Sequence, residues 1–318
     1  MEGILKGLIP AIVMPLRKDY RLDERALERY VRQKITSCDI AAVAVNTDAG
    51  EGLALLPEER NRVVQVVKGI VGKRVPVVCG ISGATTLQAV EYARAFQDMG
   101  ADYFLVMPQT AFRGARGKDP VIIKYHEALA MVGVPLIIFQ LQESLGGVSL
   151  PHETLRELVA MDGVVAIKEA SFDAVKYKET VGFLHSLKKH VTILTGNDNF
   201  ILESFVLGGE GALIGFGSVF TDIQVEAIRL VQGKKYEQAF ALFSTIKKLC
   251  DYCFQAPVRD YRARMKEVLV QQGVFPTNLV RPPLLPVSAR EQRALKSILC
   301  EIPRRGRRAG NKRTDILP

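Results

Sequence analysis

The amino-acid sequence predicts an α/β fold, a (β/α)8 TIM barrel with an all-α C-terminal extension. Between residues 8 and 215, short apolar runs alternate strictly with longer amphipathic segments, which implies parallel βαβ units. There are eight such runs, the number that closes a barrel, and their span of about 210 residues fits one barrel. A doubly wound open sheet is the alternative, but no G-x-G-x-x-G follows the first run, where that fold would carry it.

Each predicted strand is a short apolar run, of the kind found in strands that are buried on both faces. The predicted strands are 8–14, 40–46, 75–80, 102–107, 134–140, 163–168, 191–196 and 211–215. The helical patterns between them are 23–36, 57–71, 86–99, 119–131, 151–161, 173–188 and 199–208. Pro57 and Pro151 mark helix starts, and Gly100, Gly133 and Gly163 fall where a helix stops before the next strand.

Further helical patterns follow the last predicted strand, and together they form the extension. They are 220–232, 234–254, 259–270 and 288–300, and a proline-rich loop joins the last two. We therefore expect a barrel catalytic domain at 1–218, a helical extension at 219–302 and a disordered basic tail at 303–318. The tail accounts for +5 of the net charge of +9, so the body carries too little basic surface to indicate a nucleic-acid partner.

The composition is that of a globular cytoplasmic protein, with 48% apolar and 24% charged residues. No apolar stretch approaches the roughly 18–20 residues of a membrane span. Pro10 and Pro15 interrupt the apolar N-terminus, which we interpret as a first strand and not a signal peptide. Five thinly spread cysteines, an odd number, indicate a reducing compartment. We expect no membrane partner.

Lys168 ends the apolar run 163–168, where a lysine is unusual. An ammonium group taken out of water costs several kcal/mol unless it is paired or deprotonated. Desolvation lowers a lysine pKa, and the neutral amine is then a nucleophile toward carbonyl groups. The alternative is a lysine that has left the sheet and points to solvent. In a barrel of this type the active site lies at the C-terminal ends of the strands, and this favours the nucleophile.

The same rule gathers the other segments that follow predicted strands. They are 46–51, 79–82, 108–113, 139–144, 196–199 and 215–218. Around a desolvated lysine, this assembly suggests amine chemistry on a carbonyl compound.

Four segments make the chain resemble a known family over roughly residues 5–290. They are NTDAGEGLALLPEER (46–60), GADYFLVMP (100–108), VVAIKEAS (164–171) and LGGEGALIGFGSV (207–219). The family is the dihydrodipicolinate synthase/N-acetylneuraminate lyase group of class I lyases. Its members are (β/α)8 barrels in which the strand-6 lysine, matching Lys168, forms a Schiff base with pyruvate or another 2-keto acid. The resemblance implies a homotetramer or homodimer with no cofactor and no metal.

The loop after the second strand departs from the family pattern Gly-Thr-Thr-Gly-Glu. It has Thr47, Asp48, Ala49, Gly50 and Glu51 at the matching positions. The resemblance implies that the backbone amides of Ala49 and Gly50, with Thr47, bind the keto-acid carboxylate. Asp48 replaces a proton-relaying hydroxyl, so it is a candidate acid/base or hydroxyl-binding group. Alternatively, its side chain caps the loop by bonding its own backbone.

The segment after the fifth strand departs further. Phe139 matches the tyrosine that protonates intermediates beside the Schiff base, and a phenylalanine has no proton to give. The arginine that binds the second carboxylate in the synthases falls near Ser144. Proton transfer then passes to Asp48, Gln140, Gln142, Glu143 or a bound water.

Together these residues give the expected site. Its catalytic positions are Lys168, Asp48 and Phe139, and its substrate-binding positions are Thr47, Ala49, Gly50, Gln140, Gln142 and Leu213. Sugar-acid dehydratases of this superfamily resemble the chain in lacking the tyrosine matched by Phe139, and the resemblance implies a 2-keto-3-deoxy sugar acid as substrate, undergoing aldol cleavage, condensation or dehydration. The alternatives are 4-hydroxy-tetrahydrodipicolinate synthase proper, or a catalytically weak keto-acid-binding or regulatory homologue.

Other motifs are weaker. Arg113, in the loop after the fourth strand, could bind an anionic substrate, although loop arginines are more often solvated. Cys250 and Cys253 form a C-x-x-C pair without a second pair nearby, so we interpret them as one buried helix face. The four histidines lie on or beside predicted helices, and we assign them no catalytic or metal-binding role.

Overall fold

The computed structural model describes residues 5–303, and within them eight parallel strands form one sheet in the order β1-β8-β7-β6-β5-β4-β3-β2. All hydrogen-bonded neighbours run parallel. The strands are β1 Leu8–Pro10, β2 Val43–Val45, β3 Val77–Ile81, β4 Tyr103–Val106, β5 Leu136–Leu141, β6 Val164–Ala170, β7 Thr192–Thr195 and β8 Gly211–Ile214. Each one lies within or close to a run predicted from the sequence.

The sheet closes into a barrel where β1 meets β2. A parallel bridge joins Ala11 to Ala44, and the Ile12 amide donates to the Ala44 carbonyl at 3.0 Å. Between the same two segments, the Ala41 amide donates to the Leu8 carbonyl at 2.9 Å. The segments of β1 and β2, the two ends of the strand order, are therefore bonded to each other. The predicted TIM barrel is confirmed.

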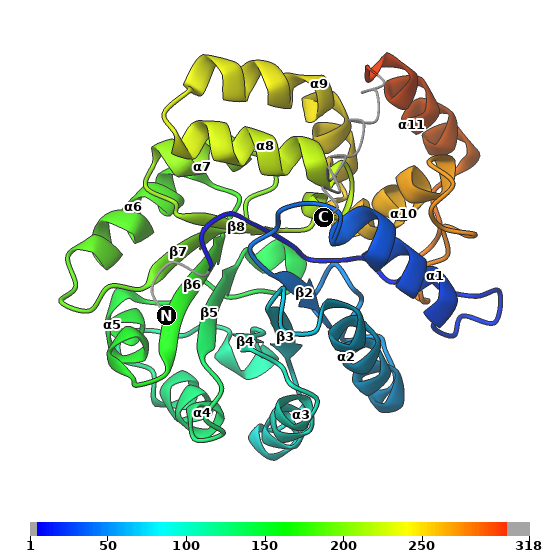
Figure 1. Ribbon diagram of the computed structural model, residues 1–318. Helices are drawn as coiled ribbons and strands as arrows, with labels where there is room; N and C mark the ends of the chain where they lie inside the picture. Colours follow the sequence, from blue (N-terminus) through cyan, green and yellow to red (C-terminus); the bar gives the residue numbers. More distant parts are fainter. Residues whose placement is uncertain (1–4, 304–318) are drawn as a thin grey trace, which may run out of the picture.

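Helices surround the strands as an outer ring (Figure 1). They are α1 Glu24–Tyr30, α2 Pro57–Val71, α3 Thr86–Asp98, α4 Pro120–Ala130, α5 His152–Ala160, α6 Ala174–His185, α7 Ile201–Val206 and α8 Thr221–Gln232. Several begin with a side-chain cap: Asp23, Thr85, Asp119 and Asp173 each accept a hydrogen bond from the first helical turn. These caps explain why the helix starts agree with those predicted from the sequence.

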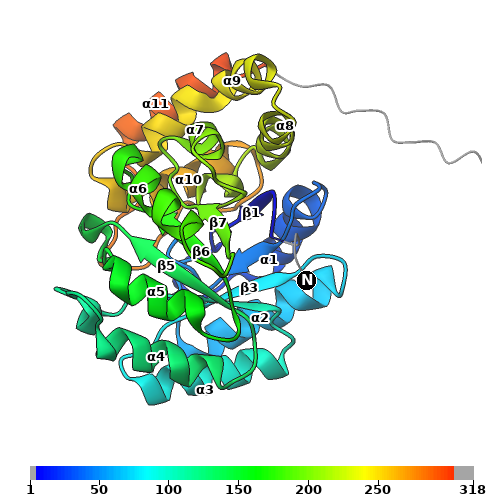
Figure 2. The ribbon, with the colours of Figure 1, turned by 90° about the vertical axis from the view of Figure 1, so that its left-hand side faces the viewer.

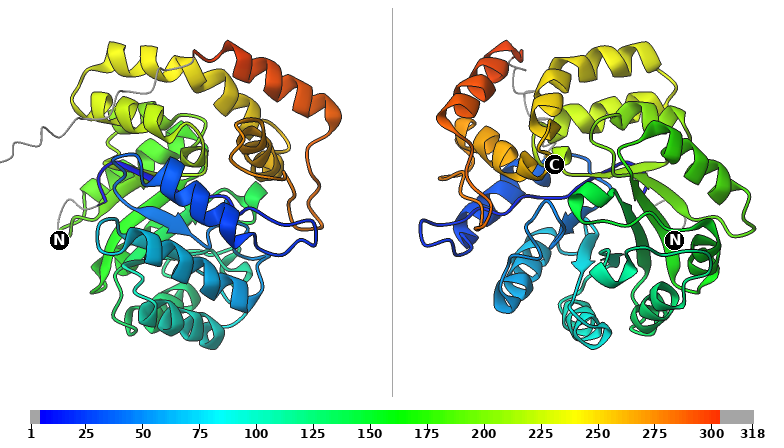
Figure 3. Two further views of the ribbon diagram at one scale, coloured as in Figure 1. Left: turned by 45° about the vertical axis from the view of Figure 1, so that its right-hand side comes forward. Right: turned by 180° about the vertical axis from the view of Figure 1, so that it is seen from behind.

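The chain after the barrel is helical, as predicted. It forms α9 Tyr236–Phe254, a 3₁₀ turn η5 Val258–Asp260, α10 Tyr261–Gln271 and α11 Ala289–Glu301. Helix α9 packs on α8, and α11 packs on α9 and α10. Figures 2 and 3 show these helices gathered on one side of the barrel. The predicted domain boundaries stay predictions, and the basic tail lies, apart from Pro303, outside the described residues.

One continuous apolar core joins the barrel to the extension. Strand residues such as Ile167 and Leu213 belong to the same cluster of buried side chains as Phe243 of α9 and Val268 of α10. The extension is therefore packed as part of the barrel's core. Within residues 5–303, no helix is both long and apolar enough to cross a membrane.

Buried ion pairs tie the loop after β2 to the extension. Lys266 of α10 has a fully buried ammonium that pairs with Glu51 and also donates to the Leu279 carbonyl at 2.7 Å. The other oxygen of Glu51 accepts the Arg281 amide at 2.8 Å, and the Arg281 guanidinium binds both oxygens of Glu59. These bonds fix the strand-2 loop at the mouth of the barrel against residues more than two hundred positions away.

We expect Lys266→Ala to destabilise the fold by about 3–5 kcal/mol, because it leaves the Glu51 carboxylate buried without its cation. Urea denaturation followed by circular dichroism measures the loss. Lys248→Ala is the matched control, since Lys248 pairs with Glu301 in solvent and such pairs contribute about 1 kcal/mol or less. Equal losses in the two variants would contradict the role given to the buried pair.

Candidate active site

Lys168 lies near the C-terminal end of β6 with its side chain directed into the barrel. In the sheet it is in register with Phe139 of β5 and Leu194 of β7. Its Nζ atom lies 4.1 Å from the centre of the Phe139 ring, and the residue is only 7% exposed. The predicted burial of this amine at the end of a strand is thus observed, and the alternative of a solvated lysine is wrong.

Gly196, the first residue after β7, makes room for the lysine. A Cβ atom at this position would lie 2.6 Å from Lys168 Cε and 2.7 Å from Ala170 Cβ. No such atom fits without moving the strand, so a glycine is required beside the amine.

Burial dominates the electrostatics of Lys168. It lowers the pKa of the ammonium to about 8, and the negative charges of Asp198 and Asp48 oppose this shift. Burial also raises the pKa of Asp198 to about 7, although the backbone hydrogen bond from Phe216 and the charge of Lys168 act in the other direction. Near neutral pH, the neutral fraction of this amine is therefore larger than that of an exposed lysine.

Asp198 joins the ends of two strands. It is buried after β7, and its Oδ1 accepts the Phe216 amide, which follows β8, at 2.7 Å. The sequence placed Asp198 among the strand-end segments but did not single it out. Its position directly after a predicted strand was the signal that could have found it.

The loop after β2 folds into a compact turn. The Gly52 amide donates to the Thr47 carbonyl at 2.9 Å, and the Glu51 amide to the Asp48 carbonyl at 3.0 Å. Within residues 5–303, the amides of Ala49 and Gly50 donate no hydrogen bond, and the buried Thr47 hydroxyl has no partner. The turn thus holds three unused hydrogen-bond donors, as a carboxylate-binding site requires.

Asp48 is bound by the extension and not by its own loop. Its Oδ2 accepts the Tyr261 hydroxyl at 2.8 Å, and its Oδ1 pairs with the Arg262 guanidinium. Arg262 Nε also donates to the Asp48 carbonyl at 2.6 Å. The side chain therefore does not cap its own backbone. Tyr261 and Arg262 were missed from sequence because they open α10, far along the chain from any predicted strand end.

Gln140 does not reach the side of the sheet on which Lys168 lies. Its amide donates to Glu169 Oε1 at 3.2 Å and to Thr180 of α6 at 3.3 Å, while its oxygen accepts the Leu150 amide at 2.9 Å. Side chains alternate along a strand, so with Phe139 inside the barrel, Gln140 faces the helices. The expectation that Gln140 binds substrate or transfers protons does not fit this placement.

The remaining expected residues are divided between the barrel wall and its rim. Leu213 is fully buried in β8, in register with Ile9. Gln142 follows β5; its oxygen accepts the Ser144 hydroxyl at 2.5 Å, while its buried Nε2 has no partner within the described chain. Glu143 and Arg113 are exposed at the rim. Only the groups turned toward the barrel mouth can meet a molecule bound at Lys168.

Cys250 and Cys253 form a buried helix face, as interpreted from the sequence. Cys250 Sγ donates to the Asp198 carbonyl at 3.0 Å, and burial raises the pKa of Cys253 to about 12. Both thiols are therefore protonated at neutral pH. Within residues 5–303, no three His, Cys, Asp or Glu side chains gather in a way that could hold a metal ion.

A cleft of about 1090 Å³ lies elsewhere, between the segment 33–38 that follows α1, the start of α8, α10 and α11. Neither Lys168 nor Asp48 nor Asp198 lines it. We place the candidate site at Lys168 because the buried groups with shifted pKa values, Lys168 and Asp198, lie there. This is also the strand-end position that barrels of this type use.

Comparisons with known proteins show a family match along nearly the whole chain. The model of the "Dihydrodipicolinate synthetase family" matches residues 4–302. A 4-hydroxy-tetrahydrodipicolinate synthase of Rickettsia bellii is 28% identical over 307 residues, covering 95% of this chain and 99% of that protein. An uncharacterized DapA-like lyase of Pyrobaculum aerophilum is also 28% identical, over 305 residues, covering 94% of this chain and 98% of that protein.

Solved structures show the same fold. The dihydrodipicolinate synthase of Bacteroides thetaiotaomicron has a TM-score of 0.84 at 23% identity, covering 94% of this chain and 99% of that one. The chloride-inhibited enzyme of Acinetobacter baumannii, solved with pyruvate, has a TM-score of 0.80 at 24% identity over the same shares.

We expect Lys168 to titrate near pH 8, against about 10.4 for ordinary exposed lysines, because its ammonium is desolvated. Carbon-13 NMR of protein labelled at lysine Cε measures the midpoint, with Lys168→Arg assigning the signal. Asp198→Asn removes a negative charge that favours the ammonium, so it should move the midpoint below 8. A wild-type midpoint of about 10 would show that the lysine is solvated.

Proposed function

The chain belongs to the dihydrodipicolinate synthetase family, whose members are lyases, and on that premise we propose that Lys168 forms a Schiff base with pyruvate or another 2-keto acid. The observation that carries this proposal is the buried amine of Lys168, whose pKa is lowered to about 8. An amine must be neutral to attack a carbonyl carbon, and burial supplies that form.

The reaction begins when the neutral amine attacks C2 of the keto acid. Loss of water leaves an iminium ion, which withdraws electrons from C3 and allows the bond at C3–C4, or a C–O bond, to break or form. The unused amides of Ala49 and Gly50, with the Thr47 hydroxyl, bind the substrate carboxylate. Gly50 lets the turn pack closely, since a Cβ there would lie 2.9 Å from the Ile12 carbonyl oxygen.

The surroundings of Lys168 stabilise the charged intermediate. Asp48 and Asp198 place negative charge near the nitrogen, where the iminium ion carries its positive charge. The Phe139 ring covers the amine, keeps water from it, and presents its electron-rich face to a cation. Phe139 therefore acts on the nucleophile without moving a proton.

We propose a 2-keto-3-deoxy sugar acid as the substrate. Gln109, Gln142 and Ser144, which follow β4 and β5, are neutral hydrogen-bonding groups suited to sugar hydroxyls, and the Gln142 Nε2 is unused within the described chain. Ser144 stands where the resemblance places the synthases' carboxylate-binding arginine. The rim is thus better suited to a neutral, hydroxylated tail than to a second carboxylate.

A second candidate is 4-hydroxy-tetrahydrodipicolinate synthase activity, which the names of several relatives favour. Phe139 and Ser144 argue against it. A third is a keto-acid-binding protein with little turnover, which would share the Schiff base and lack the later steps. The three candidates differ in the steps after adduct formation, so they can be separated by experiment.

We also propose a cytoplasmic homodimer or homotetramer. All five cysteines are free thiols, as expected in a reducing compartment. Sedimentation of the purified protein tests the assembly directly.

Borohydride should trap pyruvate on wild-type protein as a reduced adduct at Lys168, detected by mass spectrometry, and Lys168→Ala should give none. Lys189→Ala is the matched control, because burial lowers the pKa of Lys189 too, yet its Nζ bonds the Met161 carbonyl away from the strand ends. This variant should trap as the wild type does. Absence of an adduct with every 2-keto acid tried would end the Schiff-base proposal.

Turnover assays should then identify the substrate. We expect 2-keto-3-deoxy sugar acids to be converted, with release of pyruvate for aldol cleavage or loss of water for dehydration. Turnover confined to pyruvate and the carboxylate-bearing aldehyde of the synthases would instead establish the second candidate. Trapping without any turnover would establish the third.

A further inference from the structure

A tyrosine from the extension stands at the mouth of the barrel. Tyr261, the first residue of α10, is buried, and its ring lies against the end of β8: a Cβ atom at Gly215 would be 3.2 Å from Tyr261 Cε2. The ring stacks on Phe254, with 4.9 Å between centroids and 21° between planes. Its hydroxyl donates to Asp48 Oδ2 at 2.8 Å. The phenol thus lies between the strand-8 end and the strand-2 loop.

Asp48 connects this phenol to the reactive lysine. Its carboxylate is close enough to Lys168 to raise that lysine's pKa, while it accepts the Tyr261 hydroxyl directly. Arg262 pairs with the same carboxylate and donates to the backbone carbonyl of Asp48. The carboxylate is therefore held in one orientation, with one oxygen assigned to the phenol and the other to the guanidinium.

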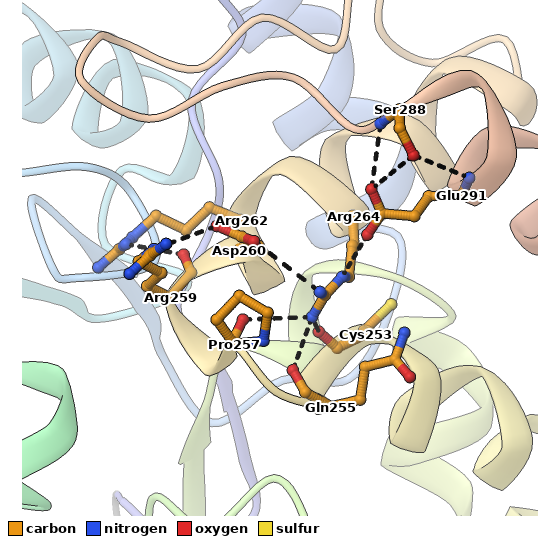
Figure 4. Close-up of polar contacts among 9 residues, drawn as sticks. All are labelled: Cys253, Gln255, Pro257, Arg259, Asp260, Arg262, Arg264, Ser288 and Glu291. Atoms are coloured by element: carbon orange, nitrogen blue, oxygen red, sulfur yellow. Dashed lines mark hydrogen bonds and ion pairs between the residues drawn. The ribbon is translucent and has the colours of Figure 1, made fainter.

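Arg264 fixes the turn that carries these two residues (Figure 4). Although only 2% exposed, it donates through Nη1 to the carbonyls of Cys253 and Gln255, at 3.1 and 2.7 Å. Its Nε donates to Glu291 at 3.2 Å, and Glu291 is itself bound by Ser288 at the start of α11. The end of α9, the start of α10 and the start of α11 are joined through one guanidinium, so Tyr261 sits on a rigid support.

The phenol keeps its proton at neutral pH. Burial and the neighbouring Asp48 charge both raise the pKa of Tyr261 well above its ordinary value. A protonated phenol bonded to a carboxylate can accept a proton on its oxygen as it passes its own to the carboxylate. Phe139, on the other side of the amine, offers no exchangeable proton.

We propose that the Tyr261 hydroxyl transfers the proton in the Schiff-base reaction, with Asp48 as the terminal acceptor. In aldol cleavage, the substrate's C4 hydroxyl proton moves to the Tyr261 oxygen while the Tyr261 proton moves to Asp48. The O–H electron pair forms the new carbonyl, the C3–C4 pair becomes the C2=C3 double bond, and the C=N π pair moves to nitrogen, giving a neutral enamine on Lys168. The reverse transfer, from Asp48 through Tyr261, protonates C3 and restores the iminium ion for hydrolysis. This inference rests on the proposed function.

Hydrogen–deuterium exchange at the pyruvate methyl group tests the transfer without the natural substrate. Enamine formation removes a C3 proton, and return from D2O solvent adds deuterium, which proton NMR follows as loss of the methyl signal. At saturating pyruvate, Tyr261→Phe should slow the exchange by about 10²–10⁴-fold, the size of a general acid–base contribution. Adduct trapped by borohydride after equilibration with pyruvate, and the pyruvate concentration for half-maximal exchange, should stay close to wild type.

Two further variants sharpen the result. Asp48→Asn keeps an acceptor for the Tyr261 hydroxyl but cannot take its proton, so it should show the same loss of exchange. Tyr236→Phe removes a hydroxyl from an exposed tyrosine of α9 and should exchange as the wild type does. Tyr261→Phe keeps the ring that packs on Phe254 and Gly215, and a thermal melt confirms that it is folded.

Exchange at the wild-type rate in Tyr261→Phe would overturn the proposal. Loss of trapping together with exchange in that variant would also overturn it, because the hydroxyl would then be holding the site together and not moving a proton. Failure of the wild type itself to trap pyruvate would instead refute the Schiff base. The two proposals can therefore fail separately.

Discussion

The strand-2 loop carries two carboxylates, Asp48 and Glu51, into the region between the barrel and α10, where unpaired charge is costly. A buried carboxylate needs a cation and hydrogen bonds to offset the loss of water, and α10 supplies both. Lys266 pairs with Glu51, while Arg262 and Tyr261 bind Asp48. The shape of the loop, and with it the free amides of Ala49 and Gly50, therefore depends on helices that follow the barrel in the chain.

Two buried lysines meet opposite requirements in this arrangement. Lys266 contacts a carboxylate and a carbonyl directly. These two groups take the place of the water molecules that an exposed ammonium would bind. Among residues 5–303, Lys168 forms no ion pair of that kind; its Nζ faces the Phe139 ring and only feels the charges of Asp48 and Asp198. Its burial is only partly offset, and this leaves an amine that loses its proton readily. The same residue type is structural at one position and reactive at the other because of the groups that stand within hydrogen-bond distance.

Most of the fold was predictable because the spacing of apolar residues and the residues that start or stop helices act locally. Apolar runs, capping residues such as Asp119 and stop glycines such as Gly163 locate strands and helices without knowledge of their partners. The position of Lys168 was predictable because the C-terminal ends of all strands of such a barrel lie together at its mouth. Gln140 was misplaced although the alternation that puts Phe139 inside already turns its neighbour outward. Tyr261 could not be found this way, since its bond to Asp48 crosses 213 positions and depends on how the extension folds back.

The proposed role of Tyr261 accounts for the loss of a proton donor at Phe139. A proton donor on β5 would approach the Schiff base from the strand next to Lys168, whereas Tyr261 lies at the end of β8, on the other side of β7. Moving the donor leaves an aromatic ring beside the amine, where its face can stabilise the positive charge of the iminium ion. Lys168 and Phe139, on β6 and β5, then provide the nucleophile and its surroundings, while Tyr261, at the end of β8, transfers the proton. On this proposal, the chain keeps the lysine, and its extension determines from which direction protons reach C3.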